Sequence, residues 1–176
     1  MKRLSIPEVA VTTVLGTGFS PIAPATVASA ATCVILWFVP SALRWPGALL
    51  MIPVFFLGVW LSGRAIGAFD VADDPRFRRF RRPNPKPDDP DQVVIDEFVG
   101  QWIVLLTVAD HRTLGGFLLA FVVFRFFDIV KPLGVGSLQR VKSGWGIMLD
   151  DVLAGIWGAL LLVVLTVVPY LLVHPL

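Results

Sequence analysis

The sequence predicts an all-α protein: a polytopic transmembrane bundle of about five spans with a short N-terminal interfacial or re-entrant segment. Hydrophobic residues make up 56% of the 176-residue chain and charged residues 16%, and the mean hydropathy is +0.77. Soluble domains are about 45–50% apolar and about one quarter charged. Long apolar runs alternate with short polar segments, and the length fits one domain over residues 1–176.

The N-terminal segment is too short to cross a bilayer. Residues 5–16 mix serine, proline and glutamate with aliphatic residues, which predicts a short helix at the membrane surface or within the bundle. The stretch Gly16–Thr26 is dense in glycine and proline and predicts turns. Thr26 or Ser29 is suited to cap the helix that follows. No cleavable signal peptide is expected.

Two apolar runs predict the first two spans. The first extends from Thr26 to a point between Val39 and Leu43, which is short of the roughly 20 residues that a bilayer crossing needs. The second covers residues 47–69, with an internal proline that a membrane helix can tolerate. A tight turn over residues 44–46 is expected to join them.

Three further spans are predicted after a long polar loop. The loop covers residues 70–92 and is rich in arginine, proline and acidic residues. The third and fourth spans are expected over residues 93–109 and 113–130. A second polar loop over residues 131–146 precedes the fifth span, which is expected over residues 147–172.

The basic residues indicate how the predicted bundle is oriented. Of the 15 lysine and arginine residues, 11 lie at the N-terminus or in the two long loops. The positive-inside rule therefore places the N-terminus and both loops in the cytoplasm and the C-terminus outside. The arginine run of the first loop is typical of a segment that contacts anionic lipids, and no nucleic-acid partner is expected.

Carboxylates gather at the predicted cytoplasmic ends of the spans. One pair opens the third span, a second pair opens the fifth, and a single acid lies near the end of the fourth: Asp96, Glu97, Asp150, Asp151 and Asp128. Carboxylates at one depth repel one another unless a cation or protons intervene, and an oxygen-rich cluster of this kind suits Mg²⁺. The simpler alternative is that these acids complement helix dipoles at a wet interface.

Two basic residues lie beside the acid of the fourth span. Arg125 is three residues before Asp128 and shares its helix face, and Lys131 follows at the membrane edge. Together they offer a pair of cations for a phosphate group. The alternative for Arg125 and Asp128 is a structural ion pair.

Four stretches, in order along the chain, resemble the phosphatidylglycerophosphatase A family, bacterial membrane lipid phosphatases. They are Gly16–Thr26, Val94–Trp102, Phe124–Pro132 and Gly144–Gly155. The resemblance implies an integral membrane enzyme of phosphatidylglycerol biosynthesis in the bacterial inner membrane. It implies Mg²⁺-dependent hydrolysis of the terminal phosphomonoester of phosphatidylglycerophosphate at the cytoplasmic face.

The resemblance also implies roles for individual residues. The metal and catalytic candidates are Asp96, Glu97, Asp128, Asp150 and Asp151. The candidates for holding the substrate phosphate are Arg125, Lys131, Thr26 and Ser20. Two positions depart from the family pattern, because Ala25 and Ser143 stand where the family usually has glycine.

Several alternatives stay open at this point. Hydrolysis by a metal-activated water and hydrolysis through an aspartyl-phosphate both fit the acids. A cysteine-based phosphatase fits poorly because Cys33 lies in a span, and a histidine-based one because His111 and His174 fall on the outer side. A rival of another class is a small membrane ion-binding or transport protein, whose acids should lie deep in the spans. A non-catalytic scaffold leaves the acid pairs unexplained.

Overall fold

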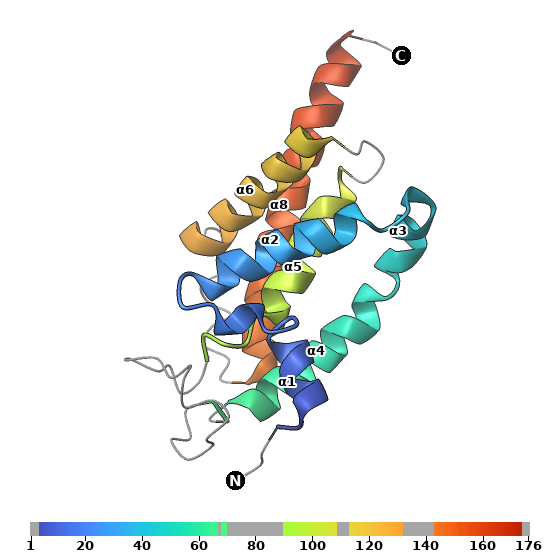
Figure 1. Ribbon diagram of the computed structural model, residues 1–176. Helices are drawn as coiled ribbons and strands as arrows, with labels where there is room; N and C mark the ends of the chain where they lie inside the picture. The colour runs from blue at the N-terminus through green and yellow to red at the C-terminus, as the bar shows by residue number, and fades with distance from the viewer. Residues whose placement is uncertain (1–3, 67, 70–89, 109–112, 132–142, 174–176) are drawn as a thin grey trace.

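The computed structural model describes residues 4–66, 68–69, 90–108, 113–131 and 143–173. Within these ranges every regular element is a helix, which confirms the all-α prediction (Figure 1). The elements are α1 (Ile6–Thr12), the 3₁₀ turn η1 (Thr17–Phe19), α2 (Pro24–Trp37), α3 (Ser41–Ala48), α4 (Met51–Ala65), α5 (Ile95–Leu106), α6 (Leu114–Val130) and α8 (Gly144–Val173).

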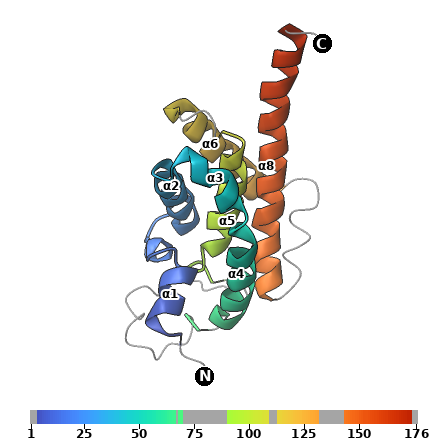
Figure 2. The same ribbon diagram turned by 90° about the vertical axis from the view of Figure 1, so that its right-hand side faces the viewer.

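Helix α5 is the centre of the bundle, and α2, α4, α6 and α8 all pack against it. Eight of its 12 residues are buried, which is why an apolar segment can also carry polar side chains there without exposing them. Helices α5 and α8 both rise from the end of the molecule that carries α1, and the far end of α8 stands clear of the other helices (Figures 1 and 2).

Two glycines bring the backbones of α5 and α8 into direct contact. A Cβ atom built on Gly155 would lie 2.6 Å from the carbonyl oxygen of Gly100. A Cβ atom on Gly100 would lie 2.6 Å from the carbonyl oxygen of Asp151. Only glycine lets two helices approach this closely. This crossing fixes the first turns of α8 against the first turns of α5.

The N-terminal segment contacts α4 and the residue that precedes α5. A capping box begins α1, because the Ser5 hydroxyl accepts from the Glu8 amide at 3.4 Å and the Glu8 carboxylate accepts from the Ser5 amide at 2.7 Å. Glu8 also pairs with Arg64 of α4 at 3.0 Å. At the other end of α1, the Thr12 carbonyl accepts from the Val94 amide at 2.9 Å. The predicted short N-terminal helix is therefore confirmed.

Three local predictions were wrong. Neither Thr26 nor Ser29 caps α2, which begins at Pro24 after Ala23, an N-cap residue in the left-handed region. Proline suits the first position of a helix because it has no amide hydrogen that needs a partner and its φ is already helical. The expected turn over residues 44–46 is part of α3, which carries Pro46 inside it. The last span begins earlier than expected, at Gly144.

Two described helical segments are long and apolar enough to cross a membrane: Trp45–Ala65 and Gly144–Thr166. Helices α2 and α5 have 14 and 12 residues. At 1.5 Å per residue they are roughly 21 and 18 Å long, against a hydrocarbon core of about 30 Å. The five-span arrangement therefore stays a prediction, and both predicted cytoplasmic loops lie largely outside the described residues.

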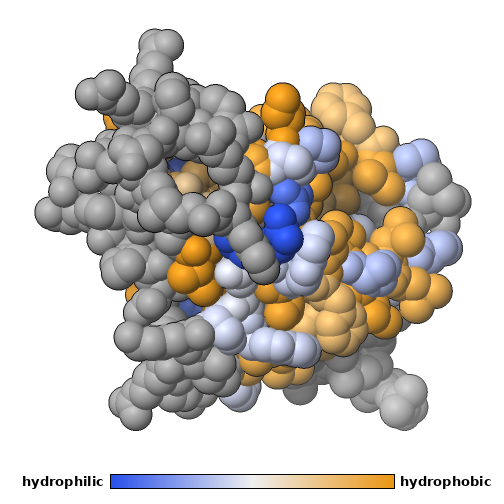
Figure 3. Space-filling view, turned by 90° about the horizontal axis from the view of Figure 1, so that it is seen from below, coloured by the Kyte–Doolittle hydropathy of each residue, from blue (hydrophilic) through white to orange (hydrophobic). Residues whose placement is uncertain are grey.

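Apolar side chains cover much of the described surface. Exposed examples on α4, α6 and α8 include Phe56, Trp60, Leu118, Val122, Val164 and Leu165. Surfaces of this kind indicate an apolar environment or partner, so the protein is suited to association with a membrane. Viewed from the end that carries α1, hydrophilic residues occupy a small area with hydrophobic residues around it (Figure 3).

Candidate active site

Three helices supply the candidate acids, and all five acids are buried. Asp96 and Glu97 lie in the first turn of α5, Asp128 lies in the last turn of α6, and Asp150 and Asp151 lie in the second turn of α8. Each of the five residues is at most 8% exposed.

The five carboxylates form one cluster. Oxygen atoms of Asp96, Asp150 and Asp151 all lie within 4.8 Å of one another. The charge of Asp151 also interacts with those of Asp128 and Glu97. The predicted convergence of the two acid pairs and the single acid is therefore present in the structure. Their roles in catalysis and metal binding stay predictions.

The two basic candidates lie inside the same cluster. Nη1 of Arg125 is 2.7 Å from Oδ2 of Asp128, so the ion pair predicted as the alternative for these two residues is present. Nζ of Lys131 is 2.5 Å from Oδ2 of Asp150 and 4.0 Å from Oδ1 of Asp128. Burial alone would lower the pKa of Lys131, but the bond to Asp150 and the nearby carboxylates raise the pKa above its usual value.

The backbone at Lys131 explains how a residue at the end of α6 reaches α8. Lys131 is the C-cap of α6 and adopts the left-handed conformation, with φ 47° and ψ 50°. That conformation costs a non-glycine residue roughly 1–2 kcal/mol. The amide of Lys131 still donates to the Phe127 carbonyl at 2.9 Å. The strained cap turns the chain so that the lysine side chain meets an acid of α8.

The donor set fits a divalent cation. Five carboxylates face two basic side chains, which leaves a formal excess of three negative charges when all are ionised. Within the described residues, Oε2 of Glu97 and Oδ2 of Asp151 are buried and have no hydrogen-bond partner. Buried anionic oxygens without partners are costly, and oxygen ligands with room for water are what Mg²⁺ prefers.

The two weaker candidates lie in the segment before and at the start of α2. The Ser20 hydroxyl donates to the Ile22 carbonyl at 2.8 Å, and Thr26 is half-buried in the first turn of α2. Gly18, two residues before Ser20, packs against the Gln92 backbone so closely that a Cβ atom would overlap it. This contact ties the loop to the chain entering α5. Contact of Ser20 or Thr26 with a phosphate stays a prediction.

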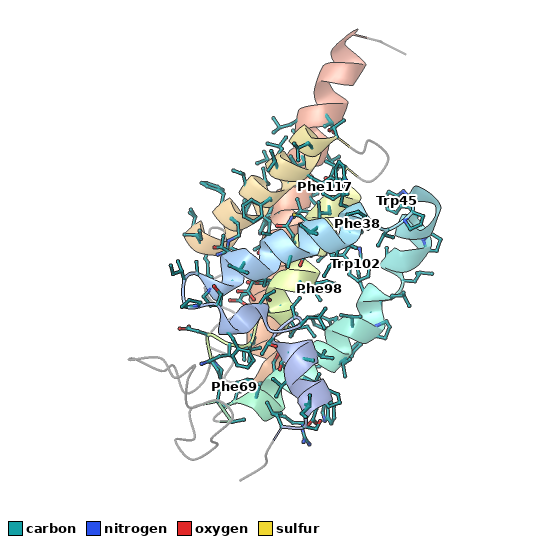
Figure 4. All side chains as sticks on the ribbon, viewed as in Figure 1. Phe38, Trp45, Phe69, Phe98, Trp102 and Phe117 are labelled. Carbon is teal, nitrogen blue, oxygen red and sulfur yellow. The ribbon has the colours of Figure 1, made fainter. Side chains whose placement is uncertain are left out.

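The opposite face of α5 is apolar. Phe98 and Trp102 of α5 and Phe117 of α6 line a cavity of about 300 Å³ together with residues of α2 and α3 (Figure 4). Every residue of this lining is apolar or glycine. Helix α5 therefore separates an acidic cluster from an apolar cavity.

One buried polar residue of α5 is not among the site residues that the sequence predicts. Gln101 lies one turn after Glu97 and is 0% exposed. The available signal was a carboxamide inside an apolar run, four residues after an acid of the predicted site. Only the tertiary structure shows that the side chain is fully enclosed.

Fold and site together define an all-helical membrane-type protein with apolar outer surfaces and a buried cluster of carboxylates and basic side chains. A family model described as phosphatidylglycerophosphatase A matches residues 10–78 and 83–166. The chain belongs to the phosphatidylglycerophosphatase A family, and it is a phosphatase.

Relatives support this membership. A Bacteroides thetaiotaomicron protein named "Putative phosphatidylinositol-3-phosphatase" is 39% identical over 171 residues, which cover 93% of this chain and 96% of the relative. Phosphatidylglycerophosphatase A of Escherichia coli is 30% identical over 148 residues, 82% of this chain and 74% of the relative. The Haemophilus influenzae protein of the same name is 44% identical over 69 residues, 39% of this chain and 42% of the relative. No solved structure matches the chain.

Proposed function

We propose that this protein is a Mg²⁺-dependent phosphatase that releases the terminal phosphate of phosphatidylglycerophosphate, giving phosphatidylglycerol and phosphate in phospholipid biosynthesis. One observation carries the proposal. In a chain of this family, the buried acids of α5 and α8 converge with Asp128, Arg125 and Lys131 of α6. This supports the proposal, because carboxylate oxygens suit a cation and basic side chains suit a phosphate.

In this proposal Asp96, Asp150 and Asp151 hold the Mg²⁺, because their oxygens lie within 4.8 Å of one another. The ion, when bound, supplies neutralisation of phosphate charge and a more acidic water. Glu97 has a buried oxygen without a hydrogen-bond partner in the described structure, so it is suited to accept a proton from the attacking water.

Arg125 and Lys131 bind the oxygens of the phosphate. Lys131 has three N–H donors, so it can keep its bond to Asp150 while it donates to a phosphate oxygen. Water adds to phosphorus, the bond from phosphorus to the glycerol oxygen breaks, and that oxygen takes up a proton. A carboxylate nucleophile that forms an aspartyl-phosphate remains the alternative chemistry.

The proposal includes a place in the cell. The enzyme crosses the bacterial inner membrane several times, with its N-terminus and active site at the cytoplasmic face and its C-terminus outside. The exposed apolar surfaces of α4, α6 and α8 and the two segments long enough to span support a membrane location. The lipid substrate would then reach the acids from the plane of the bilayer.

A second substrate has a specific observation in its favour. The Bacteroides relative, which is named a phosphatidylinositol-3-phosphatase, aligns over 93% of this chain, and the Escherichia coli relative aligns over 82%. Both head groups are polyols that carry a phosphomonoester. An ion-binding or transport function has less support than a phosphatase function. The acids lie in the first turn of α5 and the early turns of α8, whereas a transport path needs acids along the length of the helices.

The test is phosphate release by the purified protein in detergent. We expect release from phosphatidylglycerophosphate that requires added Mg²⁺ and stops on chelation, with slower release from phosphatidylinositol 3-phosphate. Faster release from the inositol lipid would replace the proposed substrate. No release from either lipid, together with cation flux in liposomes, would overturn the enzyme assignment in favour of transport.

A further inference from the structure

Gln101 is a polar side chain enclosed where the bundle is otherwise apolar. It is 0% exposed, and neither its carbonyl oxygen nor its amide nitrogen has a hydrogen-bond partner within the described part of the chain. A buried carboxamide without partners is strongly unfavourable compared with an apolar residue of similar size. Packing therefore does not account for a glutamine at this position.

The position of Gln101 points to the candidate active site. It lies four residues after Glu97, so the two side chains share one face of α5. Oε2 of Glu97 is also buried without a hydrogen-bond partner in the described structure. Phe98 and Trp102 line the apolar cavity on another face of α5, and Gly100 faces α8.

Neighbouring helices do not supply the missing partners. Helices α2, α5 and α6 pack against one another, and α2 carries the buried hydroxyls of Ser29 and Thr32. Both hydroxyls donate to carbonyl groups of their own helix, at 3.0 Å and 2.9 Å. Their protons are therefore not donated to the Gln101 carbonyl oxygen, and the Gln101 amide nitrogen also has no hydrogen-bond partner within the described residues. The carboxamide thus keeps a donor and an acceptor for a ligand.

The chemistry of the carboxamide selects the ligand. A phosphate or a metal ion would use only half of it, because phosphate oxygens only accept and a cation binds only the carbonyl oxygen. A hydroxyl group both donates and accepts, so it satisfies both halves. The site already holds carboxylates for a cation and basic groups for a phosphate.

We propose that Gln101 hydrogen-bonds a hydroxyl of the polyol that carries the phosphate, and so determines head-group specificity. This inference rests on the proposed function. A site built to hydrogen-bond a substrate hydroxyl rejects the analogue that lacks it, because the buried polar group is then left unpaired. Gln101 would make this enzyme prefer polyol phosphates over lipid phosphates without a hydroxyl.

The experiment crosses one change in the enzyme with one change in the substrate. Wild type and Gln101→Leu are assayed with phosphatidylglycerophosphate and with the analogue whose linker is propane-1,3-diol, which lacks only the hydroxyl. We expect kcat/KM of the wild type to fall roughly 10- to 100-fold on the analogue. Gln101→Leu should show that loss on the natural substrate and little discrimination between the two.

Controls separate this role from a structural one. Gln101→Met repeats the test with an unbranched side chain in case leucine is not accommodated. Thr107→Val removes a polar group at the other end of α5, where the hydroxyl donates to the Val104 carbonyl, and should leave discrimination unchanged. The thermal unfolding temperatures of Gln101→Leu and Gln101→Met should not be lower than that of the wild type, because a buried amide without hydrogen-bond partners has been removed.

The outcomes are distinct. Equal use of both substrates by the wild type overturns the proposal, as does an equal loss on both substrates in Gln101→Leu, which would indicate a structural role. If the wild type releases no phosphate from phosphatidylglycerophosphate, the proposed function itself fails, and the role of Gln101 falls with it.

Discussion

Asp151→Asn is expected to lower kcat for phosphate release by about 10²- to 10³-fold. Asparagine keeps the shape of the side chain but removes one charge from the three acids whose oxygens lie within 4.8 Å of one another. The substitution also removes repulsion between Asp151 and the charges of Asp128, Glu97 and Asp150. We therefore expect the variant in chelator to be at least as resistant to heat as the wild type, and to gain less from added Mg²⁺.

The measurements are phosphate release and thermal unfolding, each across a range of Mg²⁺ concentrations. Asp96→Asn and Asp128→Asn should behave in the same direction. Glu8→Gln is the matched control, because Glu8 is an acid that pairs with Arg64 and takes no part in the cluster. It should leave activity within about twofold of the wild type. Undiminished release by all three aspartate variants would rule out the site.

Gly155→Ala is expected to damage stability and activity together. The added methyl would lie 2.6 Å from the Gly100 carbonyl oxygen, and backbone atoms cannot turn aside as a flexible side chain can. Forced separation of packed elements costs about 1–3 kcal/mol of unfolding free energy. It would also move Asp151, one turn earlier, away from Asp96. Because displacements of about 1 Å can cost roughly 10²-fold in rate, activity should fall further than stability alone explains.

Gly115→Ala is the control for this change. Gly115 lies in the first turns of α6, and a Cβ atom there would meet no atom within 4 Å. Alanine should raise the unfolding free energy by up to about 1 kcal/mol and leave phosphate release unchanged. Thermal unfolding in detergent and phosphate release test both variants. If Gly155→Ala behaves like Gly115→Ala, the close crossing of α5 and α8 is not what aligns the acids.

Helix content and the acid positions could be predicted from sequence because both depend on local patterns. Long apolar runs with polar breaks predict helices, and two acid pairs at the starts of such runs stand out against apolar neighbours. Local patterns failed where tertiary packing or proline geometry decided the outcome. Residues 44–46 read as a turn but lie in α3, and Pro24 begins α2 without the expected cap. Helix length could not be predicted either: α5 has only 12 residues, whereas a helix that crosses a bilayer needs about 20.

By itself, the sequence determined that the chain is helical and apolar, and which acids and bases could meet at one end of the bundle. The tertiary structure decided which atoms do meet. It joined Lys131 to Asp150 through a left-handed cap, set α5 against α8 at two glycines, and enclosed Gln101 without partners. The physical reason is that helix periodicity places a residue on a face, whereas contacts at the scale of a hydrogen bond depend on how closely and at what register the helices cross.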